Sequence, residues 1–437
     1  MNLVIDPGAL TGEVRAPSSK SEAHRLLICA ALSADTTDVD CATTSADIDA
    51  TVSCLEALGA HVARTRRGFR VVGLPRDASG RPRPAQGALL DCGESGSTLR
   101  FLLPVACALG AEARLTGRGR LPERPLSPLY EGLVAHGCEL SAQGRMPLAT
   151  GGRLGAGRFE LPGDVSSQYV SGLLMAAPLT GGAVEVLVSE PVESRPYVGL
   201  TMDALSRFGV EVGEGPATTK GGSPARLFVV DAPCGFVSPG TVEVGGDWSN
   251  AAFWLAAGAL GADGVAVTGA DVQSAQGDRQ ILGALALLGA RIVRSRASVA
   301  CAPDHLAGRI LDVKSCPDLV PPLAAVAAVA TGTTHVVGAA RLRLKESDRL
   351  ATVSAAVNAL GGCAEVTGDG LVIEGTDELA GGTVDAANDH RIAMMAAVLA
   401  TRCSGPTTIV GAECVSKSYP AFFEDFATLG GAVRKES

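Results

Sequence analysis

The sequence is poor in aromatic residues, which make up 4% of its 437 residues, and it contains only six histidines. The histidines are scattered, without an H-E-x-x-H pattern or a Cys/His cluster, so we expect no protein-ligated metal. The twelve cysteines include no C-x-x-C pair and form no small secreted framework. This usage favours reduced thiols in a cytoplasmic protein.

Targeting and membrane signals are also missing. The start of the chain, Met1 to Pro7, lacks the basic region and apolar run of a signal peptide. The most apolar segment, Leu319 to Ala330, contains two prolines and is too short to span a bilayer. The net charge of -9 argues against a nucleic-acid or membrane-surface binder. An anionic ligand would therefore need a local cluster of cations.

What the chain has in quantity is small apolar residues. It is 46% hydrophobic and 19% charged, which is ample for a large core and excludes a disordered chain. Alanine, valine and leucine suit close packing of helices on sheets, and the 54 glycines fit many short turns. The length predicts two or three domains.

A helix start with unusual charge lies near the N-terminus. The polar stretch Ser18 to Arg25 follows Pro17 and precedes the apolar run Leu26 to Leu32. Hydroxyl residues before an apolar run are typical of a helix N-terminus, where exposed N–H groups favour anions over cations. Lys20 and Arg25 are therefore unfavourable there unless an anion binds between them. The alternative is an ordinary capped surface helix.

The pattern of a polar helix start before an apolar run recurs along the chain. The starts are spaced roughly 70 to 80 residues apart, which is a repeat-scale period. Five more polar starts precede apolar, alanine-rich helices: Gly93 to Thr98 before Leu99 to Leu109, Asp164 to Gln168 before Tyr169 to Leu179, Asp247 to Asn250 before Ala251 to Leu260, Cys316 to Asp318 before Leu319 to Ala330, and Asn388 to Arg391 before Ile392 to Ala400.

Glycine marks the end of a second helix in each repeat, because it supplies the left-handed closing residue. These ends are Leu58-Gly59, His136-Gly137, Phe208-Gly209, Leu288-Gly289, Leu360-Gly361 and Leu429-Gly430. We therefore predict six repeats, each with two helices and several strands, and one cleft lined by helix starts. The main boundary is expected near Ser238-Pro239-Gly240. Residues 2 to 16 are expected to form a strand pair.

The cations gather at the predicted helix starts, where they would bind phosphates or carboxylates. They are Lys20, Arg100, Arg124, Arg195, Lys345, Arg349, Arg391 and Lys417. Pro125 suits a first helical position, which would place Arg124 at the helix cap. Asp318 and Glu346 each lie at a predicted helix start beside basic residues. A carboxylate among cations stays ionised and can accept a proton, whereas a buried one can stay protonated and donate. The alternative is that both carboxylates are caps or salt-bridge partners.

At this point the residues resemble a known family, 5-enolpyruvylshikimate-3-phosphate (EPSP) synthase. The matches occur in family order over nearly the whole chain: Ser19-Lys20-Ser21-x-x-x-Arg25, Gly96-Ser97-x-x-Arg100, Glu123-Arg124-Pro125, Ser166-Ser167-Gln168, Pro317-Asp318, Lys345-Glu346-Ser347-Asp348-Arg349, Asn388-Asp389-His390-Arg391 and Lys417. Each motif is weak alone, and together they are specific.

The resemblance implies transfer of the enolpyruvyl (1-carboxyvinyl) group of phosphoenolpyruvate to the 5-hydroxyl of shikimate 3-phosphate. Phosphate is released by addition and elimination through a tetrahedral intermediate. This is the sixth step of the shikimate pathway to chorismate and aromatic amino acids, and the family is the target of glyphosate. It implies a cytoplasmic monomer that needs no cofactor and binds neither nucleic acid nor membrane.

The implied fold is a two-domain inside-out α/β barrel of six βαβαββ repeats, three per domain. Residues 1–18 and 242–437 would form one domain and residues 19–241 the other, with the active site in the interdomain cleft.

The resemblance also implies site residues. The catalytic residues would be Asp318 as general base, Glu346 as general acid, and Lys20. Shikimate 3-phosphate would be bound by Lys20, Ser21, Arg25, Ser166, Ser167, Gln168, Ser194, Asp318, Arg341 and Lys345. Phosphoenolpyruvate would be bound by Lys20, Gly96, Arg124, Gln168, Arg349, Arg391 and Lys417. Two residues depart from the common pattern, because Glu94 and Arg341 each stand where asparagine is frequent.

Three other interpretations were weighed. The sister enolpyruvyl transferase acting on UDP-N-acetylglucosamine typically has asparagine after the first lysine and a cysteine in a mobile loop. Here Ser21 follows Lys20, and the loop from Gly117 to Pro125 has no cysteine. A related RNA-end cyclase conflicts with the negative charge and the lack of a basic-aromatic surface. A repeat-built binding scaffold that lost its chemistry conflicts with the presence of Asp318, Glu346 and Lys20.

Overall fold

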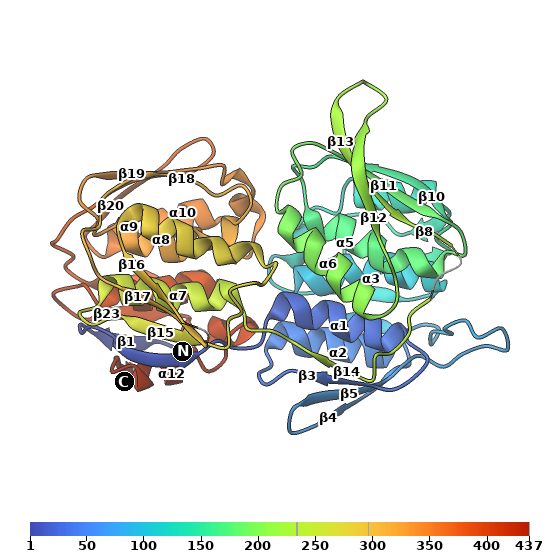
Figure 1. Cartoon of the computed structure of the whole chain (residues 1–437), viewed down its shortest axis with the longest axis horizontal. Helices are drawn as coiled ribbons and strands as arrows, with labels where there is room; N and C mark the ends of the chain where they lie inside the picture. Colours follow the sequence, from blue (N-terminus) through green and yellow to red (C-terminus); the bar gives the residue numbers. More distant parts are fainter. Residues whose placement is uncertain (233–234, 296, 437) are drawn as a thin grey trace. The chain divides into compact units, whose positions relative to one another are not determined.

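The computed structural model describes residues 1–232, 235–295 and 297–436. The chain divides into two compact units, each of which is described by itself (Figure 1). The first unit comprises Met1–Pro17 and Gly245–Ser437, and the second comprises Ser18–Val244. Among the described residues each unit contains three four-stranded sheets, so the fold is mixed α/β with six small sheets.

All six sheets share one strand order. The first two strands are parallel, as a helical crossover requires, and the third strand is antiparallel to both the second and the fourth. In the second unit the sheets are β6 (Leu89–Asp91), β7 (Arg114–Thr116), β9 (Leu148–Gly152), β8 (Cys138–Leu140); β10 (Gly157–Leu161), β11 (Val184–Ser189), β13 (Pro224–Val230), β12 (Gly213–Thr218); and β14 (Thr241–Glu243), β3 (Thr37–Asp40), β5 (Gly68–Val72), β4 (His61–Arg64).

The first unit repeats this pattern. Its sheets are β2 (Gly12–Arg15), β15 (Val265–Thr268), β17 (Ser298–Ala302), β16 (Arg291–Arg294); β18 (Ile310–Asp312), β19 (Thr333–Val337), β21 (Leu371–Glu374), β20 (Cys363–Val366); and β22 (Gly382–Asp385), β23 (Thr407–Val410), β1 (Leu3–Asp6), β24 (Ala432–Lys435). In Figure 1 the helices α7 (Trp248–Leu260), α8 (Ile281–Leu288), α9 (Val320–Ala327) and α10 (Arg349–Ala359) of this unit lie between strands β18 and β19 on one side and β1 and β15 on the other.

The expected strand pair in residues 2 to 16 is wrong. Strands β1 and β2 both form, but they belong to different sheets. β1 is an interior strand with antiparallel neighbours β23 and β24 on its two edges, which leaves no edge for β2. β2 pairs in parallel with β15 instead. A strand from a distant part of the chain therefore completes the sheet that contains β15. In the same way, β14 completes the sheet that contains β3.

Six nearly fully buried helices form the centres of the two units, where small apolar side chains allow close approach. In the second unit α3 packs on α5 and α1 on α6, and in the first unit α9 packs on both α7 and α11. Their bounds are α1 (Lys20–Leu32), α3 (Gly96–Leu109), α5 (Ser167–Ala176), α7 (Trp248–Leu260), α9 (Val320–Ala327) and α11 (His390–Ala400). The six predicted apolar helices are thus confirmed.

A second helix in each repeat ends as the glycine pattern predicts. Each is followed by a glycine with positive φ, at Gly59, Gly137, Gly209, Gly289, Gly361 and Gly430. The helices are α2 (Ala46–Ala57), α4 (Leu129–Ala135), α6 (Arg195–Arg207), α8 (Ile281–Leu288), α10 (Arg349–Ala359) and α12 (Phe422–Thr428). Short 3-10 turns complete the structure: η1 (Leu121–Glu123), η2 (Ala177–Leu179), η3 (Gly277–Gln280), η4 (Pro317–Leu319), η5 (Ala340–Leu344) and η6 (Ala412–Lys417).

Candidate active site

Polar side chains gather at the starts of the buried helices, because capping residues fix those starts. Ser19, Ser95 and Ser166 accept hydrogen bonds from backbone N–H groups of α1, α3 and α5. Asp389 does the same for α11. Each cap satisfies one otherwise unpaired donor of the first turn. The residues beside the caps are the ones that the sequence singled out.

In the first unit, Asp318 is held among three cations. Its Oδ1 lies 2.8 Å from Arg349 Nη1 and 3.1 Å from Lys345 Nζ, and its Oδ2 lies 3.3 Å from Arg391 Nη2. The backbone of η4 holds the carboxylate at the start of α9. These contacts join the beginnings of α9, α10 and α11, so three predicted helix starts meet at one carboxylate.

The charge state of Asp318 follows from these neighbours. Burial alone would raise the pKa of its carboxyl, but Arg391, Lys345 and Arg349 together outweigh burial and hold the pKa well below its ordinary value. Asp318 is therefore ionised at neutral pH.

Arg349 contacts two further carboxylates besides Asp318. Its Nη2 donates to Glu346 Oε2 at 2.6 Å, and its Nε donates to Asp389 Oδ2 at 2.8 Å. Burial would lower the pKa of Arg349, but these three carboxylates raise it, so the side chain stays charged. Asp389 is fully buried and also accepts a hydrogen bond from Ser347 Oγ at 3.0 Å.

The remaining predicted residues of this unit lie on neighbouring segments. Lys417, at the end of η6, donates from Nζ to the backbone oxygen of Asn388 at 2.5 Å, just before the start of α11. Arg341, in η5, donates from Nη2 to the backbone oxygen of Lys314 at 3.1 Å. Lys345, which directly follows η5, forms an ion pair with the Asp318 carboxylate.

In the second unit, Lys20 and Arg25 occupy the first turns of α1. Lys20 Nζ forms a 2.8 Å ion pair with Asp47, at the start of α2. Arg25 is 2% exposed, and its Nε donates to Thr201 Oγ1 at 2.7 Å. Its Nη2 donates to the backbone oxygen of Tyr197 at 3.0 Å, so Arg25 joins α1 to α6. Burial lowers the pKa of Arg25 to about 10, which keeps it charged at neutral pH.

Gln168 connects the starts of α3 and α5. Its Oε1 accepts from Arg100 Nη1 at 2.8 Å, and its Nε2 donates to Ser97 Oγ at 2.9 Å. Ser166 caps α5, and Ser167 begins it. Ser194 is buried and precedes α6 with a left-handed backbone, φ 54°. Ser21 lies in the first turn of α1, where its backbone oxygen accepts from Arg25 Nη1 at 2.6 Å.

Gly96 lies against two arginines. A Cβ atom at this position would be 2.8 Å from Arg124 Nη1 and 3.0 Å from Arg100 Nη1. Only glycine therefore leaves both guanidinium groups in place beside the first N–H groups of α3. The structure brings Gly96, Arg124 and Arg100 together, as the sequence predicted for an anion-binding helix start.

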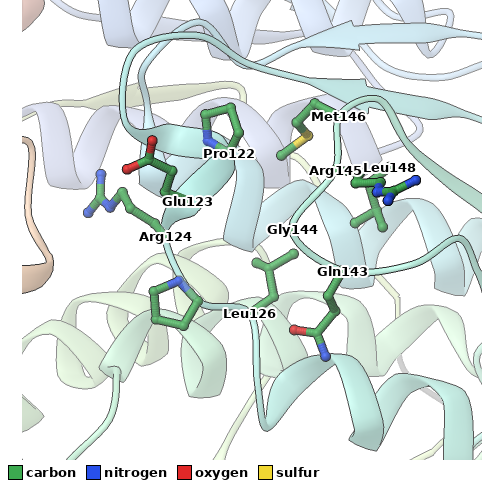
Figure 2. Close-up of a pocket in the computed structure, with 10 residues that line it drawn as sticks. Pro122, Glu123, Arg124, Leu126, Gln143, Gly144, Arg145, Met146 and Leu148 are labelled. Carbon is green, nitrogen blue, oxygen red and sulfur yellow. The ribbon is translucent and has the colours of Figure 1, made fainter.

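The predicted position of Arg124 at a helix cap is wrong. Arg124 follows the 3-10 turn η1, and the next helix begins only at Leu129. The sequence Pro122-Glu123-Arg124-Pro125 places proline in the turn, where it fits the first positions of a helical turn. Arg124 borders a cavity of about 230 Å³. Figure 2 shows Glu123 and Arg124 on one side of this cavity and Gln143, Arg145 and Met146 on the other.

Sequence reasoning missed the acidic partners of the cations. Asp47 pairs with Lys20, and Asp389 pairs with Arg349. Asp389 belongs to one of the matched motifs. Because it directly precedes the apolar run of α11, the sequence could have predicted it as the N-cap of that helix. Asp47 gave no such signal, because two acids in the first turn of α2 are ordinary helix chemistry.

Within residues 1–232, 235–295 and 297–436, no cluster of three or more His, Cys, Asp or Glu side chains has a metal-binding arrangement. Over the same residues, no helix combines the length and the apolar character needed to cross a membrane.

Solved structures with the same architecture identify the class of protein. An EPSP synthase from Acinetobacter baumannii aligns with a TM-score of 0.80 and 26% identity, covering 100% of both chains. An enolpyruvyl transferase from Streptomyces tendae aligns with a TM-score of 0.76 at 20% identity, covering 100% of this chain and 98% of that one, which bears on the fold alone. The fold is that of the enolpyruvyl transferases.

The family follows from sequence. The family model of EPSP synthase (3-phosphoshikimate 1-carboxyvinyltransferase) matches residues 4–426, and the chain belongs to this family. It is 40% identical to the 3-phosphoshikimate 1-carboxyvinyltransferase of Clostridium kluyveri, over 98% of this chain and 97% of the other. It is 38% identical to the protein of that name from Clostridium acetobutylicum, over 100% and 99% of the two chains. The family is a transferase of aromatic amino acid biosynthesis in the shikimate pathway.

Proposed function

We propose that the protein transfers the enolpyruvyl group of phosphoenolpyruvate to the 5-hydroxyl of shikimate 3-phosphate and releases phosphate. Membership in the EPSP synthase family supports this activity. The observation in the site that carries the proposal is the ionised Asp318 among Arg349, Lys345 and Arg391. A carboxylate that two arginines and a lysine hold beside three helix starts is suited to chemistry on anionic substrates.

Asp318 acts as the general base on the 5-hydroxyl. A carboxylate with a strongly lowered pKa is a weak base, so its cations must first release it. Binding of phosphoenolpyruvate supplies this step, because Arg349 and Arg391 then pair with the carboxylate and phosphate of the substrate. Their hold on Asp318 weakens, its pKa rises, and it takes the hydroxyl proton as the C–O bond forms.

Glu346 acts as the general acid. Its carboxyl contacts Arg349 at 2.6 Å, so it lies beside the same guanidinium that phosphoenolpyruvate would engage. Once protonated, it delivers a proton to the methylene carbon as the 5-hydroxyl oxygen attacks the neighbouring carbon. The tetrahedral ketal phosphate then collapses, the C–O bond to phosphate breaks, and the methyl group returns a proton to Glu346. The departing phosphate takes the proton that Asp318 holds. Lys20 and the arginines stabilise the departing phosphate.

The substrate contacts are divided between the units. For shikimate 3-phosphate we propose Lys20, Ser21, Arg25, Ser166, Ser167, Gln168, Ser194, Asp318, Arg341 and Lys345. For phosphoenolpyruvate we propose Lys20, Gly96, Arg124, Gln168, Arg349, Arg391 and Lys417. We also propose that the protein works as a monomer, the state that the family resemblance implies.

We also propose that the protein works in the cytoplasm. The eleven cysteines that the structure describes are free thiols, and ten of them are buried, which is typical of a reducing compartment.

Replacing Asp318 tests its role. Asp318→Asn keeps the size of the side chain and removes the proton acceptor, so we expect kcat to fall by about 10²- to 10⁴-fold. Shikimate 3-phosphate should still bind, as measured by calorimetry. Asp377→Asn is the control, because Asp377 is an exposed carboxylate of the same unit. Undiminished turnover in Asp318→Asn would refute the base assignment, and an equal loss in Asp377→Asn would show that the effect is not specific.

A further inference from the structure

A buried row of four polar side chains connects α1 and α2 to the start of α3 in the second unit. His24 Nδ1 lies 2.7 Å from Thr51 Oγ1, and Thr51 Oγ1 lies 2.7 Å from Thr98 Oγ1. Thr98 Oγ1 donates to Ser95 Oγ at 2.8 Å. None of the four residues is more than 1% exposed. We call this row the His24 relay.

The donors of the relay run in one direction. Ser95 Oγ accepts from the hydroxyl of Thr98 and also from its backbone N–H at 3.2 Å. The Thr98 hydroxyl has therefore used its hydrogen, and it accepts from Thr51. Thr51 has then used its own hydrogen, so His24 Nδ1 is the donor at the other end. This order fixes His24 as the tautomer with its proton on Nδ1.

The surroundings of His24 keep it neutral. Burial lowers the pKa of the imidazole well below its ordinary value, and the nearby charges of Lys20 and Arg25 on the same helix lower it further. From α3, the ring of Phe101 meets the imidazole edge to face with ring centroids 6.4 Å apart. Nε2 is buried and has no hydrogen-bond partner, as suits an unprotonated nitrogen in an apolar setting.

We propose that His24 is a positioning residue that sets the start of α3 for binding phosphoenolpyruvate. It lies one helical turn after Lys20, and the relay ends at Ser95, the residue immediately before Gly96. The relay thereby ties the helix start that carries Lys20 to the helix start that carries Gly96 and Arg100. This inference rests on the proposed function, in which Lys20 and Gly96 bind the same substrate.

The effect should fall on one substrate because α1 has a second, separate attachment. Arg25 bonds Thr201 and the backbone of Tyr197 on α6, and neither bond involves the relay. Breaking the relay leaves α1 joined to α6, where shikimate 3-phosphate is proposed to bind. It loosens only the register between α1 and the start of α3.

The first test is the tautomer, which does not depend on activity. In ¹⁵N-labelled protein at pH 7, the His24 signals, assigned by their loss in His24→Asn, should show a protonated Nδ1 and an unprotonated Nε2. A proton on Nε2 alone, or on both nitrogens, would overturn the relay.

The second test is kinetic. His24→Leu and Thr51→Val each remove one link, and each should raise KM for phosphoenolpyruvate about tenfold, the worth of one buried hydrogen bond. KM for shikimate 3-phosphate should stay unchanged. In the double variant KM for phosphoenolpyruvate should be no higher than in either single variant, because the loss of one link already interrupts the relay. His24→Asn should restore the wild-type KM, since its amide nitrogen replaces Nδ1 as donor to Thr51.

Thr150→Val is the matched control. Thr150 is a buried threonine of the same unit whose hydroxyl donates to the backbone oxygen of Ala111, away from the relay. Equal rises in both KM values, additive effects in the double variant, or the same KM change in Thr150→Val would contradict a positioning role. Wild-type protein without transferase activity would refute the proposed function, while the tautomer would still decide whether the relay exists.

Discussion

Asp318 and Glu346 are both carboxylates near a helix start, and both contact Arg349, yet their surroundings differ. Asp318 is surrounded by Arg349, Lys345 and Arg391, and Glu346 forms an ion pair with Arg349. The sequence predicted that both acids lie beside cations, and Lys345 and Arg349 do flank Glu346 in the chain. It did not predict that Arg391 and Arg349 converge on Asp318, since those contacts depend on how α10 and α11 pack.

The ionised Asp318 predicts a pH dependence of stability. Because its folded pKa lies below the unfolded value, its contribution is complete above the unfolded pKa of about 4 and is lost as the pH falls through the folded pKa. Urea unfolding of wild type and Asp318→Asn should therefore differ by a constant free energy between pH 7 and pH 5. A difference that already shrinks over that range would contradict an ionised, cation-held Asp318.

Gly96 predicts a defect specific to one substrate. In Gly96→Ala the added methyl group displaces the guanidinium groups of Arg124 and Arg100, which are flexible side-chain ends, so stability should change little. KM for phosphoenolpyruvate should rise about tenfold or more, because a displacement near 1 Å is costly in a preorganised site. Gly283→Ala, at an exposed helical glycine with open space around it, should leave KM unchanged. An unchanged KM for phosphoenolpyruvate in Gly96→Ala would show that Gly96 does not contribute to binding this substrate.

At the scale of the element, the sequence predicted the helices better than the strands. Apolar alanine-rich runs and closing glycines are local signals, and all twelve helices that they marked are present among the described residues. Strand partners are not local. The pairing of β1 with β23 and of β14 with β3 joins segments far apart in the chain. The local sequence of residues 2 to 16 therefore gave no sign of the partner strands of β1.

The closing glycines predict a graded loss of stability. Gly289 has φ +105°, and a Cβ there would lie 2.2 Å from the backbone oxygen of His305, whereas Gly430 has φ +94° and open space. Gly430→Ala should cost about 1–2 kcal/mol of unfolding free energy, from backbone strain alone. Gly289→Ala should cost about 3 kcal/mol or more, because backbone must also move. Equal losses in urea unfolding would show that the contact at Gly289 relaxes freely.

At the scale of the whole molecule, the repeat explains the distribution of the site. Every repeat presents one buried helix start, and most of the proposed site residues lie at or near a helix start. Cations at helix starts are otherwise unfavourable, so their recurrence predicted an anion-binding role, whereas the individual substrate contacts are implied by the family resemblance. The cavity beside Arg124 was not predictable, because it depends on the approach of residues 122–126 to residues 143–148.

The measurement that tests the account most directly is phosphate release from phosphoenolpyruvate, with shikimate 3-phosphate and UDP-N-acetylglucosamine offered as separate acceptors. The account predicts release with shikimate 3-phosphate alone and its loss in Asp318→Asn. Release with UDP-N-acetylglucosamine alone would contradict the substrate assignment while keeping the reaction type. Release with neither acceptor, from folded protein, would contradict the proposed function.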